Sequence, residues 1–336
     1  MSNLTKILLD KNKSCISIWF MRQAGRYLPE FKKIREKNIN FINLCLNSKL
    51  SSEITLQPIK RFDLDSAIIF SDILIIPHAI GQKVEFKKNF GPILEKFDLE
   101  KFQKSDYNDC IENLQPIYEA ISLTREKLHK NKSLIGFAGA PWTLLVYMLN
   151  LKDNKDVIEF TKLNIIKENL QFVFKKLIKL ICLHIENQFK AGADVIQIFD
   201  SWAGKIPSDK LNSFCFEPHK EISDFCKLKK IPLICFPKGI GKKYFEFNEL
   251  VKPNGLSIDY DIDPTWAAKN LKNVTIQGGM DPKYLLGSEQ KLISETKKYL
   301  DAFKDVPYIF NLGHGLKPET DPEKLKKLIN FVRDYK

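Results

Sequence analysis

Residues 133–143 read SLIGFAGAPWT. The segment begins as a short apolar run, reaches Gly139, and continues through Pro141, a residue type favoured in the first turn of a helix. It therefore predicts a β-strand that opens into an α-helix. Seven other short apolar runs end in the same way, at glycine, proline or polar residues. The eight expected strands cover residues 15–21, 66–70, 133–137, 194–199, 232–236, 256–259, 274–277 and 308–311.

Segments with helical periodicity separate most of these strands, at residues 156–190, 208–227, 284–303 and from 322 onward. Eight strands alternating with helices are typical of an α/β fold, a (β/α)8 TIM-type barrel, and a doubly wound open sheet is the alternative. Two observations favour the barrel. No G-x-G-x-x-G follows a strand, and nine of the fifteen glycines lie just past expected strand ends, where barrels place their active-site loops.

We expect a single domain over residues 1–336, because no repeat, low-complexity tract or linker interrupts the pattern. Two connections are unusually long. The extended N-terminal connection covers residues 27–65, with helical patterns at 31–37 and 41–60, and the connection between the second and third strands covers 81–132 and ends in a helical pattern at 111–128. Connections of this length are usually functional or form structure of their own.

The composition is that of a soluble globular protein, with 44% hydrophobic and 28% charged residues. The net charge of +12 favours an anionic partner, either nucleic acid or a small polyanion, although the lysines are spread over the whole chain as on a solvated surface. The seven cysteines are scattered and include no C-x-x-C, which argues against a disulfide framework and a zinc ribbon. With no signal peptide or membrane span visible, we expect a cytoplasmic protein that binds neither membrane nor nucleic acid.

Two arginines lie four residues apart in WFMRQAGRY, residues 19–27, although the chain has only six arginines among 53 basic residues. The planar guanidinium of arginine binds a carboxylate or phosphate in a forked geometry that lysine cannot reproduce. Arg22 and Arg26 are therefore candidates for anion binding, and Gly25 between them lets backbone N–H groups approach a ligand closely. Ordinary ion pairs within a loop are the alternative.

Asp72 lies in an apolar run directly after the second expected strand. A carboxylate in such surroundings must be paired, hydrogen-bonded or held for function. The functional interpretation is an anion in a dry pocket that binds N–H groups or stabilises a cation. The structural alternative is a helix N-cap or a pair with Ser71.

Three further polar residues follow expected strands. Tyr147 lies one turn after Thr143 on the expected helix, where packing is the alternative to a role for its hydroxyl. Ser201, in FDSWAG, lacks a G-x-S-x-G elbow, so hydrogen bonding to a ligand is expected rather than nucleophilic attack. His314 stands between two glycines in NLGHG, which free the backbone to place the imidazole; a structural histidine is the alternative. Without H-x-C, H-E-x-x-H or a Cys/His cluster, no metal site is expected.

Together these motifs resemble the uroporphyrinogen decarboxylase family. The resemblance rests on five segments in family order and spacing: MRQAGRYLPE at 21–30, IFSDIL at 69–74, IGFAGAPWT at 135–143, FDSWAG at 199–204 and NLGHG at 311–315. It implies a distorted (β/α)8 barrel, usually a homodimer. It also implies a carboxy-lyase of haem biosynthesis that converts the four acetate side chains of uroporphyrinogen III to methyl groups, giving coproporphyrinogen III and carbon dioxide.

The resemblance implies substrate contacts at Arg22, Gln23, Ala24, Gly25, Arg26, Asp72, Tyr147, Ser201 and His314. By this resemblance, the arginine loop binds substrate carboxylates and Asp72 contacts the pyrrole N–H groups. Phe137 and Phe199 would line the pocket. Three positions depart from the family pattern: Tyr260, Gly279 and Pro237 stand where Trp, Asn and Ala are common.

The chemistry requires no cofactor, because protonating a pyrrole carbon gives an iminium-like cation that accepts electrons as carbon dioxide leaves. We expect Asp72 and Arg22 to be catalytic, Asp72 by stabilising this cation. Arginine is a poor general acid, with a pKa above roughly 12, so the identity of the proton donor stays open. The alternatives are a zinc-dependent methyltransferase on the same barrel and a basic polyanion-binding protein, which rests on the charge alone.

Overall fold

The computed structural model of the chain describes residues 2–87, 91–152 and 158–335, and it has the eight expected strands. They are β1 (Ser17–Ile18), β2 (Ser66–Ile68), β5 (Ser133–Gly139), β6 (Val195–Asp200), β7 (Leu233–Pro237), β8 (Gly255–Ile258), β9 (Thr275–Gly278) and β10 (Tyr308–Phe310). The strands pair in parallel in the order β1-β10-β9-β8-β7-β6-β5-β2. Each strand lies beside its neighbour in the sequence, without the reversal of a doubly wound sheet. The prediction of a (β/α)8 barrel is confirmed.

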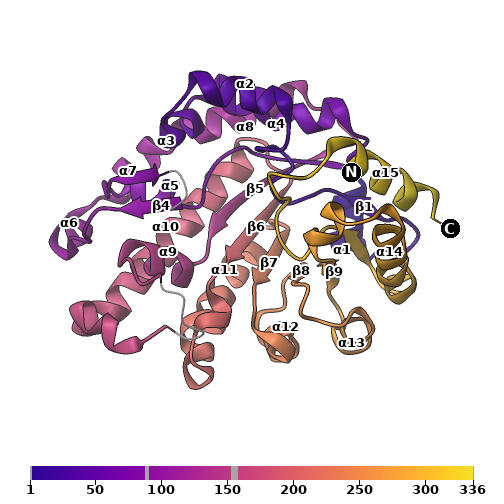
Figure 1. Cartoon of the computed structure of the whole chain (residues 1–336). Coiled ribbons are helices and arrows are strands. Elements are labelled where there is room, and N and C mark those ends of the chain that lie inside the picture. The colour runs from indigo at the N-terminus through magenta and orange to yellow at the C-terminus, as the bar shows by residue number, and fades with distance from the viewer. Residues whose placement is uncertain (1, 88–90, 153–157, 336) are drawn as a thin grey trace.

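Helices surround the strands (Figure 1). The α-helices of the described residues are α1 (Asn3–Asp10), α2 (Pro29–Lys37), α3 (Phe41–Cys45), α4 (Ser48–Arg61), α5 (Ile75–Ala79), α6 (Leu99–Lys104), α7 (Tyr107–Asn113), α8 (Gln115–Lys127), α9 (Pro141–Met148), α10 (Leu170–Lys190), α11 (Glu217–Leu228), α12 (Tyr244–Val251), α13 (Pro264–Asn270), α14 (Glu289–Phe303) and α15 (Pro322–Asp334). In this part of the chain, no helix has both the length and the apolar character needed to cross a bilayer.

The two long connections hold structure of their own. The first carries α2, α3 and α4, close to the expected helical patterns. The second carries α6, α7 and α8 and also an antiparallel hairpin of β3 (Val84–Lys87) and β4 (Gly91–Leu94), which the sequence did not predict. The expected helix at 156–190 begins partly outside the described residues and continues as a 3₁₀ segment, η1 (Phe160–Asn169), before α10.

The barrel interior is closed at the N-terminal end of its strands by α1. Leu4, Ile7 and Leu8 of α1 pack with buried residues of the inner strand faces, among them Trp19 and Ile135. These side chains fill the interior of the barrel at that end. A functional site must therefore lie at the other end, where the strands finish and the loops begin.

β1 and β2, the two edge strands of the sheet, form no strand ladder with each other and are joined largely by side chains. Asp65, just before β2, accepts a hydrogen bond from the Ile18 N–H (2.7 Å) and donates its own N–H to the Ile18 carbonyl (2.9 Å). Further along, the buried amide of Gln23 accepts from the Phe20 N–H (3.0 Å) and donates to the Ser66 carbonyl (2.9 Å). We call this set of four hydrogen bonds the β1–β2 seam.

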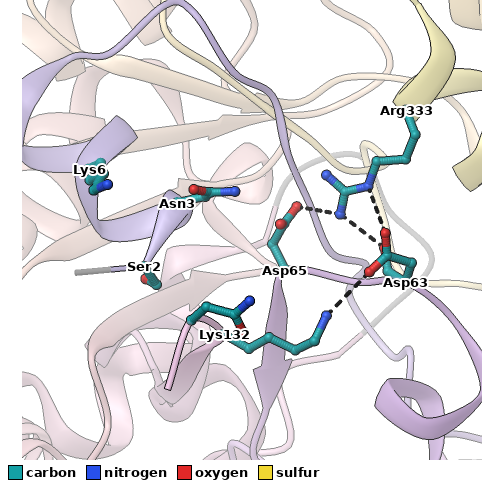
Figure 2. A pocket seen from close by; sticks show the side chains of 8 residues that line it. Ser2, Asn3, Lys6, Asp63, Asp65, Lys132 and Arg333 are labelled. Atoms are coloured by element: carbon teal, nitrogen blue, oxygen red, sulfur yellow. Dashed lines mark hydrogen bonds and ion pairs between the residues drawn. The ribbon is translucent and has the colours of Figure 1, made fainter. Parts of the chain in front are cut away.

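Arg333 of α15 supports the seam from outside, as Figure 2 shows. Its Nη2 donates to Asp65 Oδ2 at 2.7 Å, and its Nε lies 3.5 Å from Asp63 Oδ2. Lys132 Nζ lies 3.4 Å from Asp63 Oδ1. These residues line a cavity of about 410 Å³ at the N-terminal end of the barrel. Because the arginine and this lysine are already paired there and the strands begin rather than end at this place, we do not regard the cavity as the active site.

Replacing Asp65 by alanine should weaken the seam strongly. The change removes the acceptor of the Ile18 N–H and leaves Arg333 without its closest partner, so we expect the free energy of unfolding to fall by about 3 kcal/mol. Asp63→Ala is a matched control, since it removes a carboxylate that contacts the same arginine from an exposed position, and should cost under about 1 kcal/mol. Urea unfolding measures both; equal losses would show that the seam does not depend on Asp65.

Candidate active site

The predicted site residues lie at the carboxyl ends of the strands. Arg22 follows β1, Asp72 follows β2, Ser201 follows β6 and His314 follows β10, while Tyr147 lies on α9, the helix after β5. Because the eight strands are parallel, their carboxyl ends share one end of the barrel, opposite the end that α1 closes. The structure thus places residues from distant parts of the sequence around one mouth.

Arg22 and Arg26 are exposed at this mouth, and neither guanidinium forms an ion pair or hydrogen bond with a described residue. Desolvation of the guanidinium by its surroundings lowers the pKa of Arg22, and the charge of Arg26 adds to this, while the nearby Asp72 acts in the opposite direction. Arg22 has a left-handed backbone, with φ of 62°, which costs a non-glycine residue roughly 1 kcal/mol. The described residues therefore do not form the ordinary ion pairs that were the alternative interpretation of Arg22 and Arg26.

Asp72 holds one oxygen in a turn and leaves the other open. Its Oδ1 accepts a hydrogen bond from the Leu74 N–H at 2.9 Å, and Oδ2 accepts none from a described residue. The alternative pair with Ser71 does not form, because the Ser71 hydroxyl has no partner within the described ranges. Burial raises the pKa of Asp72 to about 6, opposed by the Leu74 hydrogen bond and the charge of Arg22.

Gln23 is fully buried, and its polar groups are all used inside the protein. Its side-chain amide forms the β1–β2 seam, its N–H donates to the Phe20 carbonyl (3.0 Å), and its carbonyl accepts from the Tyr27 hydroxyl (2.9 Å). The residue therefore holds the turn in which Arg22 lies. Its direct contact with substrate stays a prediction from the family resemblance, and no polar group of Gln23 is free to make one in this structure.

Ala24 and Gly25 present backbone N–H groups that donate to no described residue. A Cβ at Gly25 would lie 2.9 Å from the Arg22 carbonyl oxygen, so the turn is too tight for a side chain. Free N–H groups beside two uncommitted guanidinium groups form a concentrated set of donors. Such a set suits a carboxylate.

The glycines on both sides of His314 pack closely against other parts of the chain. A Cβ at Gly313 would lie 2.5 Å from the Tyr260 nitrogen, and one at Gly315 would lie 2.5 Å from Cδ of Arg22. Burial lowers the pKa of His314 to about 3, with the charges of Lys238, Arg22 and Lys317 contributing. The imidazole is therefore neutral near pH 7 and can donate or accept a hydrogen bond among cations.

Lys238, one of those cations, was not among the predicted site residues. It directly follows β7 and is partly exposed, and its ammonium pairs with no carboxylate within the described ranges. The signal was available in the sequence, because Lys238 and Ser201 each stand two residues after the end of an expected strand and shortly before a glycine.

Aromatic rings form the wall on the β5–β6 side. Phe137 and Phe199 are partly exposed and meet edge-to-face with ring centres 5.6 Å apart. The Tyr147 ring lies 6.0 Å from that of Trp202, and burial raises the Tyr147 pKa, with Asp72 adding to the rise and Arg22 opposing it. Ser201 is exposed and hydrogen-bonds to no described residue.

The departure at Gly279 has a local explanation. Its φ is 101°, and a Cβ there would lie 2.5 Å from a ring carbon of Tyr299. Tyr299 occupies the space that a larger residue would need, and its hydroxyl donates to the Gly279 carbonyl at 2.8 Å. Only glycine fits this backbone beside Tyr299.

A buried group of three ionisable residues lies behind Ser201. The ligand-type atoms of Asp200, Cys215 and His219 all lie within 4.8 Å of one another. His219 Nδ1 is 2.8 Å from the Cys215 carbonyl oxygen, so this nitrogen is the protonated donor and has no lone pair for a metal. The Cys215 carbonyl therefore holds the ring in the tautomer that leaves the lone pair on Nε2, which is buried and accepts no hydrogen bond from a described residue.

Comparison with known proteins identifies the family. A sequence model described as uroporphyrinogen decarboxylase (URO-D) matches residues 1–335. The chain belongs to the uroporphyrinogen decarboxylase family. Uroporphyrinogen decarboxylase of Rickettsia felis is 42% identical, with the alignment covering 97% of this chain and 95% of the relative, and that of Orientia tsutsugamushi is 39% identical over 100% and 99%.

Solved structures agree on the fold. A methyltransferase from Methanosarcina mazei superposes with a TM-score of 0.79 at 16% identity, covering 99% of this chain and 97% of that one. A putative vitamin-B12-independent methionine synthase from Listeria monocytogenes gives 0.56 at 12% identity, covering 95% of each. At these identities the likeness concerns the barrel alone. Membership of the uroporphyrinogen decarboxylase family confirms the resemblance found in the five motifs and the expectation of a carboxy-lyase of porphyrin biosynthesis.

Gly315→Ala should displace the Arg22 side chain while leaving the barrel intact. The added Cβ would meet the flexible Cδ, Cγ and Nε of Arg22 rather than backbone. We expect kcat/KM for decarboxylation to fall at least about tenfold, with little change in melting temperature. Gly287→Ala is the matched control, because its Cβ would meet nothing closer than the Tyr284 carbonyl at 3.7 Å. Equal activity of the two variants would separate Gly315 from the site.

Proposed function

We propose that this chain converts uroporphyrinogen III to coproporphyrinogen III at the mouth described above, removing four acetate carboxyl groups as carbon dioxide. The observation that supports this most strongly is the open carboxyl group of Asp72 close to the unpaired Arg22. A substrate with eight carboxylates and a ring of pyrrole N–H groups offers partners for both charges. Family membership supplies the reaction.

Arg22 and Arg26, with the N–H groups of Ala24 and Gly25, bind substrate carboxylates. Uncommitted guanidinium groups need no ion pair to be broken before a ligand binds, so their charge is available in full. Gln23 acts through the β1–β2 seam, by fixing the turn that these groups share.

Asp72 binds the converging pyrrole N–H groups through its free Oδ2 and stabilises the cation that forms when a pyrrole carbon is protonated. A buried anion in place before the reaction stabilises a developing positive charge far more than solvent does. This cation is the electron sink as carbon dioxide leaves, so the ring itself supplies the chemistry that a cofactor would otherwise provide.

Tyr147, Ser201 and His314 supply the remaining polar contacts, and Phe137 and Phe199 line the apolar wall. A neutral His314 accepts or donates without adding charge beside the two arginines. Arg22, next to Asp72, is the second catalytic residue: burial lowers its pKa, which favours a part in proton delivery compared with a solvated guanidinium.

The chain acts as one barrel domain over residues 1–336, as a homodimer in the cytoplasm. The single eight-stranded sheet supports one domain. Seven cysteines present as free thiols fit a reducing compartment. Light scattering of the purified protein measures the dimer, and a monomer at micromolar concentration would contradict it.

Anaerobic incubation with uroporphyrinogen III tests the reaction itself. After oxidation, chromatography should resolve products with seven, six, five and four carboxyl groups, ending at coproporphyrin III. Carbon dioxide should be released in a ratio of about four per ring, as the removal of four acetates requires. Unchanged substrate would refute the proposed function.

Asp72→Asn should separate activity from folding. The amide keeps the shape but loses the charge, so kcat should fall about 100- to 1000-fold. Because the folded-state pKa of about 6 lies above the ordinary 3.8, the wild-type protein loses stability as pH rises through this range. The variant lacks that loss and should unfold at higher urea than wild type near pH 8. Normal turnover in the variant would remove Asp72 from the mechanism.

The pH profile of kcat/KM should have an acid limb near pH 6, because this constant reports ionisations of the free enzyme. Below the pKa of about 6, protonated Asp72 no longer offers a negative charge to the pyrrole N–H groups. Bound substrate favours the carboxylate, so the limb in kcat should lie at lower pH. A flat kcat/KM between about pH 5 and about pH 8 would contradict an essential ionised Asp72.

A further inference from the structure

The buried carboxyl group of Asp200 takes no part in the reaction proposed above. Asp200 ends β6, immediately before Ser201, and none of its surface is exposed. Burial raises its pKa to about 7. Enclosing a carboxyl group in this way is costly unless its contacts compensate, so the contacts show what the residue does.

The first contact joins β6 to α9. The Thr143 hydroxyl donates to Asp200 Oδ1 at 2.6 Å, and the same hydroxyl accepts from the Trp202 N–H at 3.1 Å. Thr143 is in the first turn of α9, and Tyr147 lies one turn further along. One hydroxyl therefore ties the residues on both sides of Ser201 to the helix that holds Tyr147.

The second contact joins β6 to β7. The Lys238 N–H donates to the Asp200 carbonyl at 3.1 Å, and the Lys238 carbonyl accepts from the Gly204 N–H at 2.9 Å. A Cβ at Gly204 would lie 2.5 Å from the Gly239 carbonyl oxygen, so the two loops are in direct contact. The end of β6 thus sets the position of the loop that begins with Lys238.

Among the residues that the structure describes, no cation balances the Asp200 carboxyl group on the side away from the mouth. His219 Nδ1 lies 3.9 Å from Oδ2, but burial lowers the His219 pKa to about 4, so the ring is neutral. The hydrogen-bonding groups that favour the charged form are the Thr143 hydroxyl, the Cys215 thiol and the Thr143 backbone N–H. The Thr143 hydroxyl is therefore the main polar support of Asp200 on the side facing the mouth.

We propose that Asp200 is a positioning residue, which through Thr143 and its own backbone holds Tyr147, Ser201 and the Lys238 loop in the arrangement that the substrate requires. Asp200 touches no reacting atom. The inference rests on the proposed function, in which Tyr147 and Ser201 contact the tetrapyrrole.

Thr143→Val and Thr143→Ser test the positioning role directly. Valine keeps the shape but removes the hydroxyl, so kcat should fall about 10- to 100-fold through misplacement of the contacts. Serine keeps the hydroxyl and should restore most of the rate. Thr124→Val is the matched control: Thr124 is equally buried and its hydroxyl donates to the Ala120 carbonyl within α8, far along the sequence from the mouth residues. It should lower stability without lowering kcat.

A combination with Tyr147→Phe and Ser201→Ala separates positioning from a general loss of structure. If Thr143 acts through these two side chains, adding Thr143→Val to the double variant should lower kcat by less than about twofold. If Thr143→Val lowers kcat in the double variant by the same factor as in wild type, the proposal is overturned. A wild-type kcat in the single Thr143→Val variant would also overturn it. Asp200→Asn should repeat the Thr143→Val phenotype if it folds.

Wild-type protein in the same assay distinguishes failure of the proposed function from failure of the positioning role. Inactivity of every protein, wild type included, is failure of the proposed function. Decarboxylation by wild type and by Thr143→Val at the same rate is failure of the positioning role alone.

Discussion

The β1–β2 seam is the constraint on which the arrangement of the active site depends. The eight-stranded sheet closes into a barrel only where its two edge strands, β1 and β2, meet, and here the joining groups are the side chains of Asp65 and Gln23 together with the Asp65 N–H. For Gln23 to reach back to Phe20, the chain must reverse immediately after β1. Arg22 lies in that reversal with its left-handed backbone, so the closure of the fold and the placement of the arginine follow from the same hydrogen bonds.

The residues at the mouth lower the stability of the protein but are the ones that bind substrate. An exposed arginine loop without ion pairs and a carboxyl group with a raised pKa both lower the stability of the empty protein. The substrate offers the missing partners, carboxylates for the cations and N–H groups for the anion, so binding energy is gained where folding energy was lost. The charged residues at the N-terminal end of the barrel differ from those at the mouth. Asp65 and Arg333 are paired with each other and only help to close the barrel between β1 and β2.

Much of this could be predicted from the sequence because barrel strands are short apolar runs that end at glycine or polar residues. The β3–β4 hairpin was missed because its alternate residues are charged or exposed and it packs outside the barrel. Gln23 and Asp200 were the harder cases. Both stand inside motifs. Sequence alone does not distinguish a polar residue that faces a ligand from one that hydrogen-bonds to a distant part of the chain, as Gln23 does to Ser66 and Asp200 to Thr143.

A crystal structure of the protein with coproporphyrinogen III, grown without oxygen, would show whether the tetrapyrrole binds at the mouth with its N–H groups on Asp72. We expect the ring at the carboxyl ends of the strands, with its pyrrole nitrogens about 3 Å from the Asp72 carboxylate and a propionate on the Arg22–Arg26 turn. A tetrapyrrole bound elsewhere, for instance in the cavity beside Asp65 and Arg333, or bound at the mouth with its nitrogens turned away from Asp72, would contradict this expectation.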